Sequence, residues 1–214
     1  MLKDNGLRGS VPPELSLMTT LQYLDLGNND LRFGDVTLPT QLGLLTNLEL
    51  LDLFWTYANG PIPSELGMLS KLTRLQLSNN NQMSGSIPSE VGMMRDLEEL
   101  VLENCRLVGR LPPQLGLLLA LDLWELNLEG NYLTGPIPNE FNDAIQLRRS
   151  REAVEQDLVV RLGGSNSLTG SIPEGMCALQ RLKYYCDDTG ANGLCGCEGC
   201  ECLASDQRGN PDEP

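Results

Sequence analysis

Few of the side chains in this sequence could carry out chemistry. The chain of 214 residues contains seven cysteines but no histidine. A Ser-His-Asp triad, a Cys-His pair and a histidine metal site are therefore excluded. The sequence also contains no phosphate-binding loop, no Gly-x-Ser-x-Gly nucleophile motif and no dinucleotide-binding glycine motif. We predict a protein that is not an enzyme and that needs no cofactor.

Six of the seven cysteines lie in the last quarter of the chain, where several states compete. They are Cys177, Cys186, Cys195, Cys197, Cys200 and Cys202. As disulfides of unknown connectivity they would indicate an oxidising compartment. Alternatively, the last four could bind zinc or another soft metal as thiolates, or the thiols could be unpaired. We favour disulfides and predict no metal, because the acidic neighbours Glu198 and Glu201 do not stabilise thiolates.

The elements that position these residues follow from a repeated phrase, L-x-x-L-x-L-x-x-N-x-L-x-G-x-I-P. Its clearest copy runs from Leu123 to Pro138, and the prolines Pro63, Pro88 and Pro112, which end three earlier copies, are 25 and 24 residues apart. In each copy L-x-L alternates apolar and polar residues, which is typical of a strand. One such strand is too short to bury its leucines alone. We therefore expect the copies to stack as a parallel sheet over a continuous core.

The phrase resembles that of the plant-type leucine-rich-repeat family, whose mark is the L-x-G-x-I-P ending, and the resemblance covers residues 1 to about 176. It implies an α/β-type solenoid: a leucine-rich-repeat horseshoe or superhelix with a concave parallel β-sheet and a mostly irregular or short-helical convex side. It also implies that the concave sheet binds proteins or peptides, since the family includes receptor-kinase ectodomains and secreted enzyme inhibitors. The cysteine-rich end is similar to the C-terminal flanks of secreted members, including those of algae and diatoms.

The polar position three residues after the last strand leucine predicts a structural ladder. An inward amide at this position can pair with backbone groups that the turn leaves unsatisfied. The predicted ladder residues are Asn29, Thr56, Asn80, Cys105, Asn131 and Asn166. We therefore interpret Cys105 as a small buried residue with a structural role.

The outward side chains of the strands form the predicted ligand-binding surface. They are Tyr23, Asp25, Leu50, Asp52, Phe54, Trp55, Arg74, Glu99, Glu103, Glu125 and Glu129. The apolar and aromatic members are typical interface anchors, although they could instead pack only against their own coil. The four glutamates form an acidic block. Asp25 and Asp52 could approach each other on neighbouring strands, but we interpret them as a solvated acidic surface rather than a catalytic pair.

The charge of the chain limits its partners. A net charge of −14 and a pI near 4.3 argue against binding to nucleic acid or to an anionic membrane. We expect a protein or peptide ligand with an apolar anchor flanked by Lys or Arg. No apolar run approaches the roughly 20 residues that span a bilayer. The chain begins within a copy of the phrase, so we expect an extracellular protein, or one attached to a membrane through a missing segment.

We expect three regions in the chain. About seven repeats, the first one partial and without an N-terminal cap, occupy residues 1–176, followed by a cysteine-rich cap over 177–203 and a disordered acidic tail over 204–214. An insertion near 148–158 interrupts the repeats, because Ser150 stands where a strand leucine is expected; Leu158, Val160 and Leu162 could supply that strand. The insertion is a loop over one face, a loop without a role, or the product of a splicing error in the predicted gene.

Our functional hypothesis is a non-catalytic recognition module of a receptor-like or secreted protein, which binds through the concave sheet. One alternative is a secreted enzyme inhibitor. Another is an intracellular scaffold whose cysteine-rich tail binds a metal.

Overall fold

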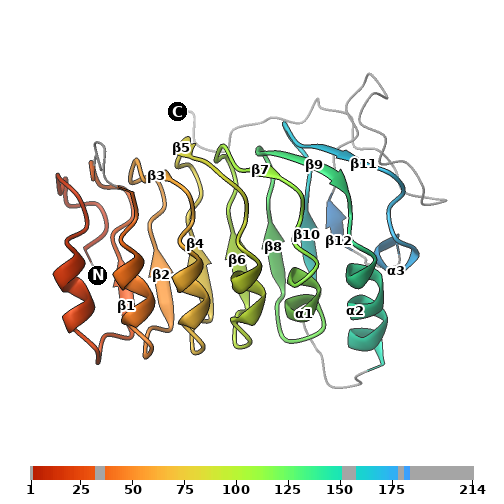
Figure 1. Ribbon diagram of the computed structural model, residues 1–214, viewed down its shortest axis with the longest axis horizontal. Coiled ribbons are helices and arrows are strands. Elements are labelled where there is room, and N and C mark those ends of the chain that lie inside the picture. The colour runs from red at the N-terminus through yellow and green to blue at the C-terminus, as the bar shows by residue number, and fades with distance from the viewer. Residues whose placement is uncertain (1, 32–36, 151–157, 178–180, 184–214) are drawn as a thin grey trace, which may run out of the picture.

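The computed structural model shows an elongated solenoid in which successive copies of the phrase lie side by side (Figure 1). The structure describes residues 2–31, 37–150, 158–177 and 181–183. The main sheet has seven parallel strands in the order β1-β2-β4-β6-β8-β10-β12. They are β1 Tyr23–Asp25, β2 Leu50–Asp52, β4 Arg74–Gln76, β6 Glu99–Val101, β8 Glu125–Asn127, β10 Val159–Arg161 and β12 Arg181–Lys183. The predicted solenoid with a parallel sheet is confirmed.

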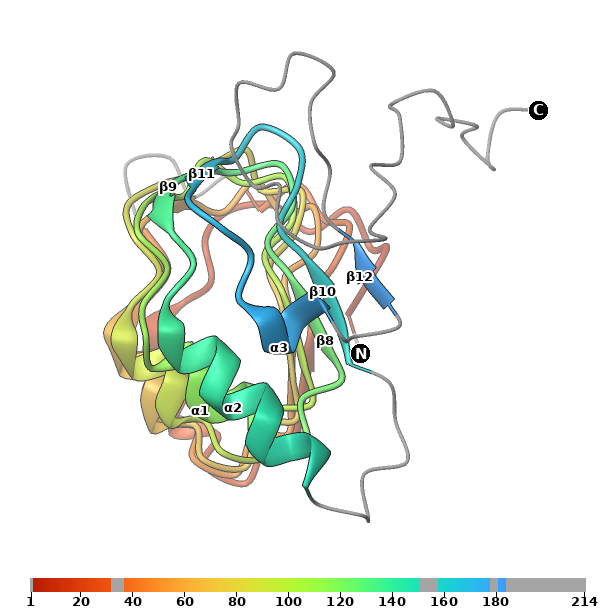
Figure 2. The same ribbon diagram turned by 90° about the vertical axis from the view of Figure 1, so that its right-hand side faces the viewer.

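Short helices cover the opposite side of the core, as the end-on view shows (Figure 2). They are the 3₁₀ helices η1 Pro13–Leu17, η2 Thr40–Leu44, η3 Ser64–Met68 and η4 Ser89–Met93, and the α-helices α1 Leu115–Leu119, α2 Asn139–Arg149 and α3 Glu174–Cys177. Each 3₁₀ helix starts at or just after the proline of the phrase, whose fixed φ suits the extended residue before a helix. In η3, for example, the N–H of Leu66 donates to the carbonyl oxygen of Pro63 at 3.1 Å.

Two smaller parallel sheets follow the turns that leave the main sheet. One pairs β3 Asn59–Gly60 with β5 Gln82–Met83. The other has the order β11-β9-β7 and consists of β7 Val108–Gly109, β9 Tyr132–Pro136 and β11 Ser167–Thr169. Through these strands, the backbone of the L-x-G-x-I-P ending forms hydrogen bonds with the equivalent segment of the next coil.

The core consists mainly of stacked leucines between the main sheet and the helices. Leu75 and Leu100 pair in register on neighbouring strands, and both are 0% exposed. Because each strand has only three residues, the coils on either side are needed to bury its leucines completely.

The four predicted ladder asparagines pair with backbone groups of two successive coils, whereas the hydroxyl of Thr56 donates to the carbonyl oxygen of Leu53 in its own coil and to the Asn80 side chain. The Asn80 side chain accepts the backbone N–H groups of Thr56 and Ala58, both at 3.0 Å, and donates to the carbonyl oxygens of Leu53 at 2.7 Å and Leu77 at 2.8 Å. Asn29, Asn131 and Asn166 make the same kinds of bond. The buried thiol of Cys105 donates to the carbonyl oxygen of Leu77 at 3.4 Å.

Glycine sets how closely successive helices approach each other. The residues at one equivalent position are Gly43, Gly67, Gly92 and Gly116. A Cβ on Gly67 would lie 2.5 Å from the backbone oxygen of Glu90 in the next coil, which is closer than real Cβ contacts. Any larger residue would therefore force neighbouring coils apart.

The repeat that begins at Pro138 departs from this pattern. Its helix, α2, has 11 residues, and its buried side chains Phe141, Ala144, Ile145 and Arg148 fall at the spacing of one helical face. The predicted insertion of 148–158 thus begins inside the helix, and residues 151–157 lie outside the described part of the chain. Strand β10 takes the expected place between β8 and β12.

Candidate functional site

The register of the main sheet aligns the outward side chains in two columns on its open face. Strand pairing brings Tyr23, Leu50, Arg74, Glu99 and Glu125 into one column, and Asp25, Asp52, Gln76, Val101 and Asn127 into the next. The seven parallel strands therefore form one platform whose chemistry changes from coil to coil.

An aromatic pair lies at the end of strand β2. The rings of Phe54 and Trp55 meet edge to face with centroids 6.4 Å apart and an interplanar angle of 78°. Trp55 is 50% exposed and has a φ of +49°, a left-handed conformation that bulky residues rarely adopt. The equivalent residues of other coils are Asn28, Asn79, Asn104 and Gly130, types that tolerate this conformation better. The site thus holds a large exposed aromatic ring on a strained backbone.

Tyr23 extends the aromatic surface to the neighbouring strand. Its ring is 50% exposed, and its hydroxyl donates to the Glu49 carboxylate at 2.7 Å. This hydrogen bond raises the pKa of Tyr23 above its ordinary value. The ring is thereby fixed in orientation while one face remains open to solvent.

The carboxylates of Asp25 and Asp52 accept hydrogen bonds from the turns that follow their own strands. Asp25 accepts the backbone N–H of Gly27 at 3.1 Å, and Asp52 accepts that of Phe54 at 2.8 Å. Burial raises the pKa of the Asp52 carboxyl. Each side chain therefore stabilises the turn at the end of its own strand, and the turn of Asp52 carries Phe54.

The acidic block is partly neutralised by arginines. Arg74 forms an ion pair with Glu99, and Arg161 forms one with Glu125. The Glu99 carboxylate raises the pKa of the Arg74 guanidinium. The two glutamate side chains are only 12% and 16% exposed, whereas Arg74 is 45% and Arg161 28% exposed, so each pair is only partly shielded from water. The local charge is more balanced than the four glutamates alone suggest.

A polar hollow of about 420 Å³ lies over these strands. Six predicted residues line it: Asp52, Phe54, Arg74, Glu99, Glu103 and Glu125. The other predicted members, Tyr23, Asp25, Leu50, Trp55 and Glu129, do not line the hollow.

Seven residues that line the hollow were not among the predicted site residues: Gln76, Ser78, Asn79, Val101, Trp124, Asn127 and Arg161. Trp124 stands one position before β8, outside the columns that we considered, and Arg161 lies on a strand that the insertion displaced from the period. The residues that directly precede each strand, such as Gln22 and Glu49, also align from coil to coil through backbone hydrogen bonds. Trp124 is the residue at this position before β8, so including this column in the sequence analysis would have identified it.

Most of the predicted cysteine cap lies outside the part of the chain that the structure describes. Cys177 is disulfide-bonded, whereas Cys186, Cys195, Cys197, Cys200 and Cys202 lie outside the described residues. Among the helices that the structure describes, none reaches the length and apolarity of a membrane span.

Comparison with known proteins identifies relatives of the repeats. A family model described as Leucine Rich Repeat matches residues 71–94, 96–118 and 122–144. Receptor-like protein 39 of Arabidopsis thaliana is 37% identical over 82 residues, which make up 37% of this chain and 9% of that protein.

Solved structures of plant receptors are similar in fold. The LRR ectodomain of the plant membrane receptor kinase GASSHO1/SCHENGEN3 from Arabidopsis thaliana, in complex with CASPARIAN STRIP INTEGRITY FACTOR 2, has a TM-score of 0.68 and 28% identity, over 84% of this chain and 19% of that one. The plant peptide hormone receptor RGFR1, in complex with RGF2, has a TM-score of 0.70 and 27% identity, over 86% of this chain and 27% of that one. The chain thus spans less than a third of each of these relatives.

Proposed function

The chain is a leucine-rich-repeat protein of the plant type, and from this we propose that it is a non-catalytic recognition module that binds a protein or peptide on the open face of its main sheet. Two similar receptors are seen in complex with CASPARIAN STRIP INTEGRITY FACTOR 2 and with RGF2, and the latter receptor is described as a peptide hormone receptor. We further propose an extracellular location, as part of a receptor-like or secreted protein.

The observation that carries the proposal is the exposed, strained Trp55. Holding a bulky residue in the left-handed region costs on the order of 1–3 kcal/mol, and such strain concentrates at functional sites. Other coils place asparagine or glycine at this position and avoid most of that cost. The edge-to-face contact with Phe54 offsets only part of this strain, whereas an indole buried by a ligand contributes strongly to binding.

The rest of the face supplies complementary contacts for such a ligand. Phe54 links the indole to the polar hollow, and Trp124 lines the hollow further along the sheet. The ion pair of Arg74 with Glu99 lies between them, and that of Arg161 with Glu125 joins β8 to β10 beyond Trp124; the pairs offer both cationic and anionic groups. We therefore propose a ligand with an apolar or aromatic anchor and a polar segment that crosses β4 to β10.

The substitution Trp55→Asn tests this proposal, because it removes the indole and installs a residue that suits the backbone. Peptides would be selected from a displayed random library against the wild-type full chain, and their dissociation constants measured by biolayer interferometry. We expect Trp55→Asn to weaken the selected peptides by about 30-fold, the effect of losing a 2 kcal/mol anchor.

Tyr132→Ala is the matched control, since Tyr132 is also 50% exposed but lies on β9, away from the main sheet. It should leave the dissociation constants unchanged. If Trp55→Asn and Tyr132→Ala affect the selected peptides equally, the open face is not the binding surface. An activity assay against secreted hydrolases would separately reveal an inhibitor.

A further inference from the structure

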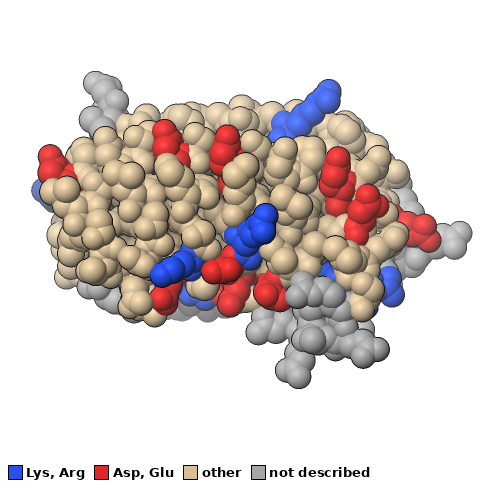
Figure 3. Space-filling model, turned by 60° about the horizontal axis from the view of Figure 1, so that its bottom comes forward, with Lys and Arg blue, Asp and Glu red and all other residues tan. Residues whose placement is uncertain are grey.

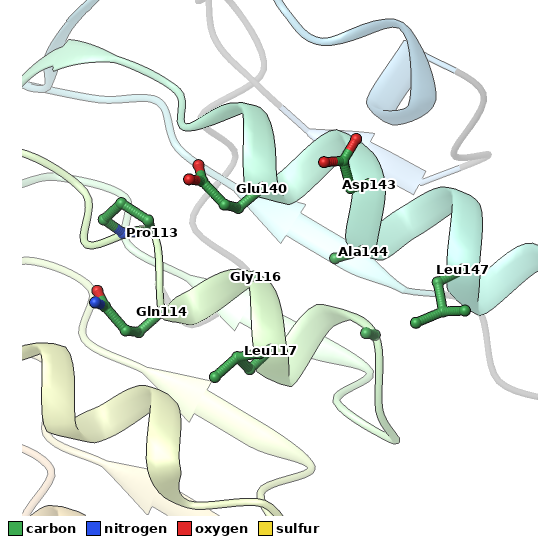
Figure 4. Close-up of a pocket in the computed structure, with 9 residues that line it drawn as sticks. Pro113, Gln114, Gly116, Leu117, Glu140, Asp143, Ala144 and Leu147 are labelled. Carbon is green, nitrogen blue, oxygen red and sulfur yellow. The ribbon is translucent and has the colours of Figure 1, made fainter.

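A second surface, on the helical side, has features of a docking site. A groove of about 440 Å³ runs between α1 and α2, and its lining is mainly apolar (Figure 4). The residues that define it are Leu117, Ala120, Glu140, Asp143, Ala144 and Leu147. It lies across the core from the open sheet face, so the function proposed above does not use it (Figure 2).

The groove arises because α2 is longer than the helices before it. One face of α2 presents Glu140, Asp143, Ala144 and Leu147, which follow the i, i+3, i+4, i+7 spacing of a single helical stripe. Helix α1 ends at Leu119, so the second half of α2 has no helix of matching length beside it.

A buried arginine fixes the two walls of the groove relative to each other. The guanidinium of Arg148, on the inner side of α2, donates to the carbonyl oxygens of Leu119 and Leu121 at the end of α1. These carbonyls lack helical partners, and a cation at a helix C-terminus satisfies them. These bonds therefore set the spacing between the end of α1 and the second half of α2.

Two large apolar side chains face solvent at the groove. Leu117 is 56% exposed and Leu147 is 57% exposed, one on each wall. Figure 4 shows Leu117 on α1 and Leu147 near the end of α2, with Ala144 between the two walls. Apolar walls of this kind favour an apolar occupant over water.

The other end of the groove is acidic. Glu140 and Asp143 lie on the first half of α2, and no salt bridge of either is found among the described residues. Figure 3 shows acidic side chains close together towards the end that carries α1 and α2, while acidic and basic side chains are mixed along the lower edge in the middle of the view.

We propose that this groove binds an amphipathic helical segment of another protein, with two apolar residues one turn apart between Leu117 and Leu147 and a Lys or Arg against Glu140 and Asp143. Charge complementarity selects this occupant. A second copy of the chain would bring its own acidic helical side, which includes Glu65 and Glu90, against the same carboxylates.

The direct test uses a fluorescein-labelled peptide of about 15 residues, long enough for a marginal helix. It carries leucines at i and i+4 and lysines one turn away, and a second version has glutamates in place of the lysines. Fluorescence anisotropy at physiological salt would measure binding to the full chain. We expect the lysine peptide to bind and the glutamate version to bind at least about tenfold more weakly.

Matched variants separate groove binding from general attraction to an acidic protein. Leu117→Asp and Leu147→Asp should each weaken the lysine peptide at least about fivefold, although they add negative charge. Leu44→Asp adds the same charge at a residue that is 54% exposed on η2, and it should not weaken the peptide. Glu140→Gln should weaken it, whereas Glu90→Gln, at the equivalent position of η4, should not.

Three results would overturn the proposal. The first is no binding of the lysine peptide to the wild-type chain. The second is equal binding by Leu117→Asp and Leu44→Asp, which would mean that the contact lies elsewhere. The third is a wild-type dimer in light scattering that Leu117→Asp dissolves, which would make a second copy the occupant.

Discussion

Removing one rung of the asparagine ladder should destabilise the solenoid far more than removing an exposed amide beside it. In Asn80→Ala, the backbone N–H groups of Thr56 and Ala58 lose their acceptor. The carbonyl oxygens of Leu53 and Leu77 lose the Asn80 amide and keep the Thr56 hydroxyl and the Cys105 thiol, respectively. Asn80 is 0% exposed, so water does not replace the side chain without rearrangement. At roughly 1–3 kcal/mol for each of the two unsatisfied N–H groups, the loss is about 4 kcal/mol.

That loss is a large fraction of a typical stability of about 5–15 kcal/mol. For a chain of this size it corresponds to a fall in melting temperature of about 10 °C. Urea denaturation followed by circular dichroism would measure the change in unfolding free energy. Hydrogen exchange would locate it, because the amides of Thr56 and Ala58 should lose protection before those of distant coils.

The control is Asn81→Ala, the same chemical change at the next residue, which is exposed. It should change the unfolding free energy by less than about 0.5 kcal/mol. The reasoning would be refuted if the unfolding free energies of Asn80→Ala and Asn81→Ala differed by less than about 1 kcal/mol, which is the contribution of about one hydrogen bond. In that case the hydrogen bonds of the ladder asparagines would contribute little to stability, and these side chains would serve only to fill the core.

Three further predictions concern packing and titration. Gly67→Ala should lower the unfolding free energy by about 1–3 kcal/mol in urea titrations, because its Cβ would meet the Glu90 backbone oxygen. Burial raises the pKa of the Cys105 thiol to about 11, so alkylation at pH 8 mapped by mass spectrometry should spare it in the folded chain. Stability should fall as pH rises from 9.0 towards that value, because the unfolded thiol loses its proton first. Asp52→Asn should raise the urea midpoint at pH 7, because burial raises the pKa of the Asp52 carboxyl and the ionised group therefore costs stability in the folded chain. The amide oxygen of asparagine can still accept the Phe54 N–H. The gain should fade at acid pH, where Asp52 is protonated in both the folded and the unfolded chain.

The repeats illustrate how much of this fold local sequence could predict. Leu75 and Leu100 lie in register because both occupy the same place in the phrase, and the period fixes which residue faces which. The outward columns could be written down for the same reason. Predicting which strands pair is usually difficult, because the partners can lie far apart in the sequence. In a repeat protein each coil contacts only its neighbours, so the pairing follows from the order of the repeats.

The irregular parts were less accessible from the sequence. Arg148 belongs to a segment that reads as a charged insertion, yet it is buried and its guanidinium binds the end of α1. Arg161 pairs with Glu125 across strands that are 36 residues apart in the sequence, outside the period. Neither contact follows from a local pattern, because each depends on where the chain returns after leaving the repeat.

The sequence by itself determined the parallel sheet, the buried leucines and the position of the ladder asparagines, because a short period places the same side chain in the same environment in every coil. Only the tertiary structure decided which glutamates are paired, that Trp55 is both exposed and strained, and that α1 and α2 leave a groove between them. Those features depend on side-chain positions in neighbouring coils and on one helix that exceeds the repeat, and a repeating pattern specifies neither.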